Sequence, residues 1–426
     1  LGTDADDPDS HVNLGVALQE AGRHEQAADA YRSAAALRPH HASTFYNLGS
    51  ALLQMDRQDE AVEAFEQALR LRPDHAQTLN NLGQVRKNQG QLDEAEACYR
   101  RALETDPKHA AAHLNLGIVQ MMRGDYAEGL QRFEWRWETP VLKPLQKRFR
   151  RPPWDGSPID GQTILVHHEQ GLGDCIQFIR YAGELKDRGA RVIALVPRPL
   201  RRLLGELQGV DEFVNPVPPS QPFDVHAATM SLPRLLGTRV ETIPAPCPYL
   251  AAEEQLVTRW RGRLDQLKEL KVGLCWRGRP EHHDDKHRSV GLDRLAPMFD
   301  LPGVSWVSLH KEEAAAAEAA DRGLGEKILS FAGEIDLGPD AFVDTAAVMA
   351  NLDLVVTVDT ALAHLAGALG RPTFLLLHWP PDWRWLLDRG DSPWYPTMRL
   401  FRQKVRGRWE PVVEDLVSAL RGQIDS

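Results

Sequence analysis

The chain has 426 residues, of which 42% are hydrophobic and 26% charged, an ordinary globular composition that excludes a largely disordered protein. Its net charge is −10, and residues 1–140 carry 14 Lys and Arg against 22 Asp and Glu, a net of −8. No basic face is obvious in the sequence, which argues against nucleic-acid binding as the main activity.

A 34-residue repeat occupies the first third of the chain. Leu-Gly pairs recur at this interval at 14–15, 48–49, 82–83 and 116–117. Prolines recur at Pro39, Pro73 and Pro107, and aromatic residues at Tyr31, Phe65, Tyr99 and Phe133. Small residues let paired helices approach closely, and a proline ends the second helix of each pair. The pattern resembles the helix–turn–helix unit of the tetratricopeptide (TPR) family. We expect three full repeats and a partial fourth within residues 1–139.

An asparagine also recurs with the same period, at Asn13, Asn47, Asn81 and Asn115. These positions should stack along the concave face that such arrays use for extended partners. Amide side chains both donate and accept hydrogen bonds, so the four could hold an acceptor polypeptide by its backbone. They could equally hydrogen-bond within their own helix pairs, and the sequence leaves both readings open.

A proline-rich joint at residues 140–160 separates the repeats from a region in which strands and helices alternate. Such alternation predicts parallel sheets covered by helices. We expect two Rossmann-like domains facing a cleft, an acceptor domain at 161–252 and a nucleotide-sugar domain at 253–426 with a closing helix. The predicted strands are 163–169, 191–197, 223–229, 271–278, 304–310, 354–359 and 373–378. The predicted helices are 174–188, 200–207, 254–267, 340–351, 360–369 and 410–421.

The cleft-facing loop after the first predicted strand contains Gln170, Gly171, Gly173 and Asp174. Ligands of parallel sheets bind outside the carboxyl ends of the strands. The loop lacks the third glycine of a dinucleotide fingerprint, because that position is Ile176. Asp174 reads equally well as the N-cap of the next helix and as a general base.

A charged loop follows the strand at 271–278. Arg277, Lys286, Arg288 and Ser289 lie at the end of this strand or in the loop, where cations and a hydroxyl suit phosphate binding. The histidines and aspartates of the loop could instead bind a metal, although no spacing in it defines a tetrahedral set. A simply solvated loop is the third reading.

The predicted strand at 354–359 ends at Asp359. Thr360 and Ala361 follow it, and His364 lies one helical turn later. A helix that begins here offers backbone amides and a dipole to an anion. The alternative is ordinary capping together with a core histidine.

Residues 163–405 resemble the heptosyltransferase-type glycosyltransferases, which have the two-domain GT-B arrangement. Three segments carry the resemblance, namely Gly173-Asp174, Asp284-Asp285-Lys286-His287 and residues 359–366 followed by 370–373. It implies that Asp174 is the general base of an inverting reaction. It also implies that Lys286 binds donor phosphate and that Asp359, Thr360, Ala361 and His364 bind the nucleotide-sugar diphosphate. No metal or other cofactor is expected. Ala361 stands where that family usually has glycine. The Trp-rich stretch 379–394 does not match those enzymes well, and its tryptophans could line a sugar subsite or pack in the core.

Repeats followed by a transferase also resemble the protein O-GlcNAc transferases, whose asparagine ladder holds polypeptide. The chain thus looks like a bacterial TPR-containing glycosyltransferase with a protein acceptor. The alternatives are a non-catalytic scaffold with a degenerate transferase domain and a transferase acting on a lipid-linked saccharide. Cys98, Cys175, Cys247 and Cys275 form no Cys-x-x-Cys motif and suggest a reducing compartment. With no transmembrane run and no signal peptide visible, we expect a cytoplasmic protein.

Overall fold

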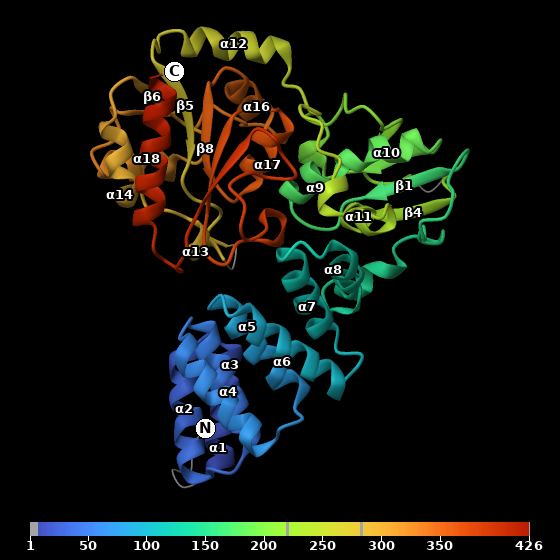
Figure 1. Ribbon diagram of the computed structural model, residues 1–426, viewed down its shortest axis with the longest axis vertical. Coiled ribbons are helices and arrows are strands. Elements are labelled where there is room, and N and C mark those ends of the chain that lie inside the picture. Colours follow the sequence, from blue (N-terminus) through green and yellow to red (C-terminus); the bar gives the residue numbers. More distant parts are fainter. Residues whose placement is uncertain (1–6, 219–220, 282–283, 426) are drawn as a thin grey trace. The chain divides into compact units, whose positions relative to one another are not determined.

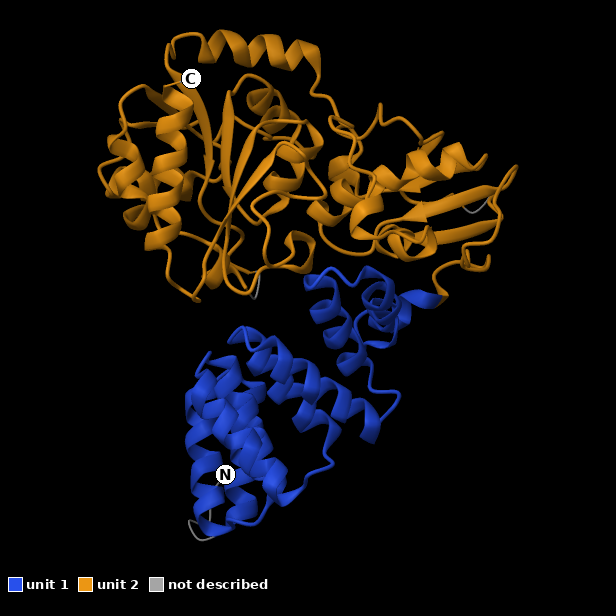
Figure 2. Cartoon of the chain, viewed as in Figure 1, with its two compact units in different colours: residues 1–146 blue, residues 147–426 orange. Residues whose placement is uncertain are grey.

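The computed structural model describes residues 7–218, 221–281 and 284–425. The chain forms two compact units, Leu1–Gln146 and Lys147–Ser426 (Figure 2). The boundary between them falls inside the proline-rich joint expected at 140–160. The predicted order, a helical repeat array followed by parallel α/β sheets, is confirmed.

The first unit consists of helices in consecutive antiparallel pairs (Figure 1). They are α1 (Pro8–Glu20), α2 (His24–Leu37), α3 (Ala42–Gln54), α4 (Gln58–Leu71), α5 (Ala76–Asn88), α6 (Leu92–Thr105), α7 (Ala110–Met122) and α8 (Tyr126–Phe133), followed by the 3-10 turns η1 (Glu134–Glu138) and η2 (Lys143–Lys147). The second helix of the fourth pair is the shortest, at 8 residues.

The repeating glycine has a specific packing role. A Cβ at Gly49 would lie 2.7 Å from Cδ1 of Phe65. Gly15 and Gly83 meet the rings of Tyr31 and Tyr99 in the same way. Each aromatic side chain is at most 1% exposed. The aromatic ring therefore fills the space that a side chain on the partner helix would need.

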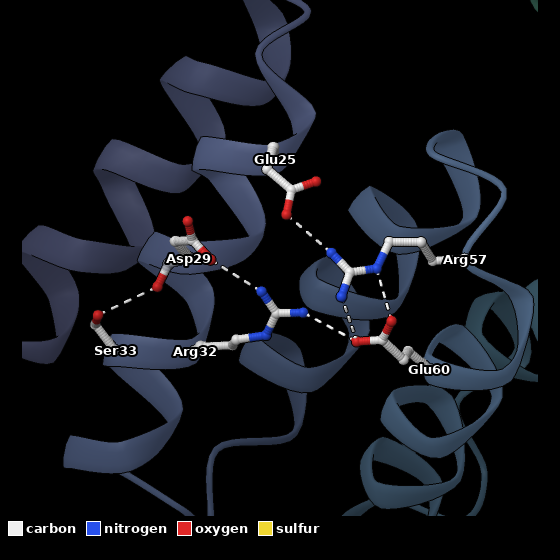
Figure 3. Close-up of polar contacts among 6 residues, drawn as sticks. All are labelled: Glu25, Asp29, Arg32, Ser33, Arg57 and Glu60. Atoms are coloured by element: carbon white, nitrogen blue, oxygen red, sulfur yellow. Dashed lines mark hydrogen bonds and ion pairs between the residues drawn. The ribbon is translucent and has the colours of Figure 1, made fainter.

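Ion pairs join neighbouring repeats on the surface, between α2 and α4 (Figure 3). Arg57 contacts Glu25 at 2.9 Å and Glu60 at 2.6 Å, and Arg32 contacts Glu60 at 3.1 Å. These side chains are 34–63% exposed. Exposed pairs of this kind contribute little to stability, so the buried helix contacts dominate the stability of the array.

The second unit contains two parallel sheets. The first has the order β3-β2-β1-β4 and the second the order β10-β9-β8-β5-β6-β7 (Figure 1). Their strands are β1 (Thr163–His167), β2 (Arg191–Leu195), β3 (Glu212–Val214), β4 (Val225–Ala228), β5 (Leu270–Cys275), β6 (Val304–Ser308), β7 (Ile328–Leu329), β8 (Leu354–Val358), β9 (Thr373–Leu377) and β10 (Met398–Arg402). β1, β8 and β9 are almost entirely buried, which agrees with their predominantly apolar sequences.

Helices pack beside both sheets. They are α9 (Leu172–Phe178), α10 (Ala182–Asp187), α11 (Leu232–Leu235), α12 (Glu254–Leu264), α13 (Asp285–Arg288), α14 (Leu292–Leu295), α15 (Glu313–Asp321), α16 (Val343–Ala350), α17 (Ala361–Ala368) and α18 (Glu410–Ile424). Apolar side chains from β5, β6, β8, β9 and α18 pack together in one cluster of the second sheet's core. Both halves are therefore rigid supports for the loops at their strand ends.

The structure corrects several sequence predictions in this unit. The helix expected at 200–207 is a series of turns after the short 3-10 turn η4 (Arg198–Leu200). The helix expected at 174–188 begins at Leu172 and is interrupted by the 3-10 turn η3 (Ile179–Tyr181). β3 and β7 have only three and two residues and were not predicted. β10 and α15 were not predicted either. No helix among the described residues is long and apolar enough to cross a bilayer.

Candidate active site

The strand order of the second sheet defines where a ligand binds. The chain runs outward from β5 through β6 to β7, and from β8 through β9 to β10 in the opposite direction. The loops after β5 and β8 therefore separate, and ligands of parallel sheets bind in the crevice at the carboxyl ends of strands where the order reverses in this way. The donor residues predicted from the sequence lie in the segments that follow these two strands.

Arg288 connects the two loops. Its Nη1 donates to the carbonyl oxygen of Asp359 at 3.1 Å, and its Nε pairs with Oδ1 of Asp285 at 3.2 Å. Next to it, the Ser289 hydroxyl accepts a 2.9 Å hydrogen bond from the amide of Gly278. Arg288 and Ser289 thus shape the crevice wall beside Asp359.

The other two basic candidates lie differently. Arg277 forms a 3.1 Å ion pair with Glu318 of α15, and Glu318 also accepts from the indole of Trp276. Lys286 is exposed on α13, in the same short helix as Arg288. The preceding histidines of this loop, His282 and His283, lie outside the described residues. The structure therefore brings Arg288 to Asp359 and directs Arg277 to α15.

Helix α17 begins directly after β8, as predicted. Thr360 is its N-cap, and the Thr360 hydroxyl accepts from the amide of Leu362 at 3.3 Å. His364 is only 6% exposed, and its Nδ1 lies 3.0 Å from the hydroxyl of Tyr395. Burial, followed by the nearby charges of Arg384 and Arg180, holds the pKa of His364 well below its usual range. His364 is therefore buried and neutral, and its role in donor binding stays a prediction.

Helix α9 packs against α17 through a glycine (Figure 1). A Cβ at Gly173 would lie 3.1 Å from Cα of Ala361, 3.4 Å from its Cβ and 3.0 Å from Cδ2 of His364. The methyl group of Ala361 therefore faces α9. Gln170 and Gly171 are exposed at the start of α9. The cleft loop of the first half and the amino end of α17 adjoin.

Asp174 is the third residue of α9 and not its N-cap, which corrects the capping expectation. Gly171 is the N-cap, and its amide donates to Oδ2 of Asp174 at 3.0 Å. The other carboxylate oxygen, Oδ1, accepts from Nη2 of Arg384 at 2.5 Å. The Asp174 side chain is 23% exposed, so solvent still reaches it.

The Trp-rich stretch provides residues that the sequence did not single out. Trp383, Trp385 and Trp394 are at most 3% exposed, which agrees with the packing reading of this stretch. Arg384 lies between the first two, in the 3-10 turn η8 (Trp383–Trp385), and pairs with Asp174. The indole of Trp385 donates to Oδ2 of Asp359 at 2.9 Å. Its position in the sequence could have indicated Arg384 as a site residue, because this stretch follows β9 just as the other site segments follow their strands.

The asparagine track in the first unit has mixed surroundings. Asn81 accepts hydrogen bonds from Gln77 at 3.0 Å and Asn80 at 3.2 Å, both in its own helix. Asn115 donates to Asn80 of the preceding repeat at 3.0 Å. Asn13 is exposed and Asn47 partly exposed. Two of the four amides are thus engaged by neighbouring side chains, and the polypeptide-binding role stays a prediction.

Comparisons with known proteins agree with this organisation. Residues 304–376 match the model of glycosyltransferase family 9 (heptosyltransferase). Tetratricopeptide-repeat models match residues 6–74, 52–104 and 80–134. The chain therefore joins tetratricopeptide repeats to a region that carries a glycosyltransferase match. This match supports a glycosyltransferase.

Individual relatives are distant. Protein FlbA of Caulobacter vibrioides (strain ATCC 19089 / CIP 103742 / CB 15) is 28% identical over 323 residues, covering 70% of this chain and 53% of FlbA. The chain thus spans about half the length of this curated relative. Among solved structures, MamA from Desulfovibrio magneticus RS-1 has a TM-score of 0.30 at 24% identity, over 33% of this chain and 78% of that one. PilF of Pseudomonas aeruginosa has a TM-score of 0.30 at 22% identity, over 32% and 62%. These two scores are too low to carry an argument.

Proposed function

We propose that the chain transfers a sugar from a nucleotide-sugar donor to a hydroxyl of a protein acceptor held by the repeat array, with inversion at the sugar carbon. One observation carries the proposal. Asp174 at the start of α9 and the amino end of α17 adjoin, because Gly173 packs on Ala361. A carboxylate and an anion-binding helix end thus share one cleft, as the transfer of a sugar from a diphosphate requires.

The chemistry divides between the two halves. The Asp174 carboxylate takes the proton of the acceptor hydroxyl, whose oxygen bonds to the anomeric carbon as the bond from that carbon to the diphosphate breaks. The departing diphosphate carries the electron pair away. The amides at the start of α17, together with Lys286 and Arg288, stabilise this charge. In this proposal, fixed cations and amides do the work that a metal does elsewhere.

The acceptor follows from the first unit. Tetratricopeptide arrays bind extended polypeptides along the concave face. The net charge of −8 over residues 1–140 favours an acceptor with a basic segment. Ala361 does not argue for a degenerate scaffold, since its methyl group faces Gly173.

The first test is calorimetry with UDP, GDP, ADP and CMP and with their sugars. We expect selective binding of one base, weakened in Asp359→Ala and Lys286→Ala. Lys268→Ala replaces another exposed lysine of the same unit and should bind normally. Binding by none of these nucleotides to the folded protein would overturn the proposal and favour the scaffold.

The second test concerns the acceptor and the base. Asp174→Asn should retain nucleotide binding and lose transfer by about 10²–10⁴-fold, the usual range for general base catalysis. Transfer to a lipid-linked saccharide in the absence of protein would replace the acceptor assignment while leaving the donor site intact.

A further inference from the structure

Arg384 is a buried cation, and each of its three side-chain nitrogens donates to a partner in the same unit. Its side chain is 8% exposed. Nε donates to Oε1 of Gln177 at 2.7 Å, Nη1 to Oδ1 of Asp382 at 2.9 Å, and Nη2 to Oδ1 of Asp174 at 2.5 Å. The guanidinium also lies over the ring of Trp383, 4.7 Å from its centroid. The planar group is thereby fixed in position and orientation.

Burying Arg384 between distant segments costs more free energy than an exposed ion pair with Asp382 alone would cost. Burying a guanidinium is unfavourable unless it meets well-placed carboxylates. Asp382 is only two residues away and supplies one of them, yet Arg384 also reaches α9, where Asp174 is 210 positions earlier in the chain. The contact joins the second half of the unit to the residue at the mouth of the cleft.

The Asp174 carboxylate is consequently held from both sides. The Gly171 amide contacts Oδ2 and Arg384 contacts Oδ1, while 23% of the side chain remains exposed. Near this pair, Asp382 lies beside Arg384 and Asp359 lies behind Trp385. The charges of Arg384 and Arg180 both act on the buried His364, and those of Arg384 and Arg288 both act on Asp359. Of these cations, Arg384 donates to the Asp174 carboxylate directly.

We propose that Arg384 is a positioning residue that orients the Asp174 carboxylate and keeps it ionised for proton transfer. The inference rests on the proposed function, because it assigns Arg384 to the same reaction. Arg384 acts through Asp174 and does not itself contact substrate. A misplacement of a catalytic group by about 1 Å costs up to about 10²-fold in rate, so loss of this contact should be visible in turnover.

The test measures release of the nucleotide from whichever donor the calorimetric panel identifies, using the full chain. Arg384→Met removes the charge and keeps a side chain of similar length. Arg384→Lys keeps the charge but lacks the planar guanidinium with its several N–H donors. We expect Arg384→Met to lower kcat by about 10- to 100-fold with the donor KM nearly unchanged. The acidic limb of its pH–rate profile should move to higher pH. Arg384→Lys should restore part of kcat and return that limb toward its original position.

A double-mutant cycle separates positioning from general stabilisation. In the Asp174→Asn background, Arg384→Met should lower kcat by less than about twofold, because the residue it acts through is already gone. Arg180→Met is the matched control. Arg180 is another buried arginine between the two halves, and it donates to the carbonyls of Trp394 at 2.7 Å and Pro244 at 3.1 Å. Any effect of Arg180→Met should be the same with and without Asp174→Asn.

Two results would overturn the inference. One is a loss in Arg384→Met that simply multiplies with that of Asp174→Asn. The other is an unmoved acidic limb. Melting temperatures measured for the same four proteins distinguish failure of this inference from failure of the proposed function. If the two substitutions are coupled in melting temperature but no donor is turned over, the proposed function is wrong. If a donor is turned over but the two substitutions are not coupled in kcat, only the role of Arg384 is wrong.

Discussion

The indole nitrogen of Trp385 donates a 2.9 Å hydrogen bond to Oδ2 of Asp359, the residue that links β8 to α17. Trp385 follows directly after Arg384, whose guanidinium contacts Asp174. Two consecutive residues therefore hold one carboxylate from each half of the second unit. The segment after β9 thus links the two sides of the candidate active site.

The ionisation of Asp359 should affect stability in a defined pH window. Burial, reinforced by the neighbouring Asp382 carboxylate, raises the pKa of Asp359 to about 6. Between about pH 4 and 6 the folded chain then holds a proton that the unfolded chain has released, so this group lowers stability as the pH rises. Asp359→Asn keeps an acceptor for Trp385 and should remove this decline, on the order of 1–2 kcal/mol across the window. Urea unfolding at pH 4, 5 and 6.5 would measure it, and an unchanged pH dependence would contradict the assignment.

His310 should act in the opposite direction. Burial and the nearby charge of Arg277 lower the pKa of His310 to about 3, and its Nε2 accepts from the amide of Trp276 at 3.3 Å. Below about pH 6.5 the unfolded chain gains a proton that the folded chain refuses. Stability is then lost on acidification by up to about 1.4 kcal/mol per pH unit. His310→Gln retains an acceptor and should reduce the slope between pH 6 and 5 by about 1 kcal/mol.

Tryptophan fluorescence is a suitable probe for both pH experiments, because nine of the eleven tryptophans belong to the second unit. Equal slopes for His310→Gln and the unmodified chain would show that His310 takes up a proton in the folded state.

The contact between α9 and α17 should be sensitive to one methyl group. Gly173→Ala places Cβ 3.0 Å from His364 and 3.1 Å from the backbone of Ala361. Overpacking costs roughly 1–3 kcal/mol and helix propensity returns about 1, so we expect a net loss of about 1 kcal/mol and weaker nucleotide binding. Gly183→Ala in α10 meets no atom within 4 Å and should gain about 0.5–1 kcal/mol. If both variants melt above the unmodified chain, the close contact is wrong.

The glycines of the repeats should behave in the same way. In Gly49→Ala the new Cβ would lie 2.7 Å from a buried Phe65 ring, so a net loss of about 1–2 kcal/mol is expected although alanine favours helix. Hydrogen exchange of peptides from α3 and α4 in the full chain should become faster. Adding Phe65→Leu should restore part of the protection, because the smaller side chain makes room; strictly additive losses would argue against direct contact.

How much of this could be read from the sequence depends on the range of the interactions. The 34-residue period determined the repeat array, because each pair packs only on its neighbours and the same glycine–aromatic contact recurs. The strand ends determined which loops form the crevice, since apolar runs and local turns specify both. Asp174, Arg288 and Asp359 were proposed as site residues in this way.

Tertiary structure alone decided which of these residues meet. The partners Arg384 and Asp174 are 210 positions apart, and no period or local motif relates them. Their contact depends on how the two sheets are packed, which in turn requires glycine at 173 and a buried Trp-rich segment after β9. The direction of Arg277 toward Glu318 and the burial of His364 also follow from side-chain packing between distant elements. Local sequence determined the elements and their loops, whereas long-range packing decided which charged groups share the cleft.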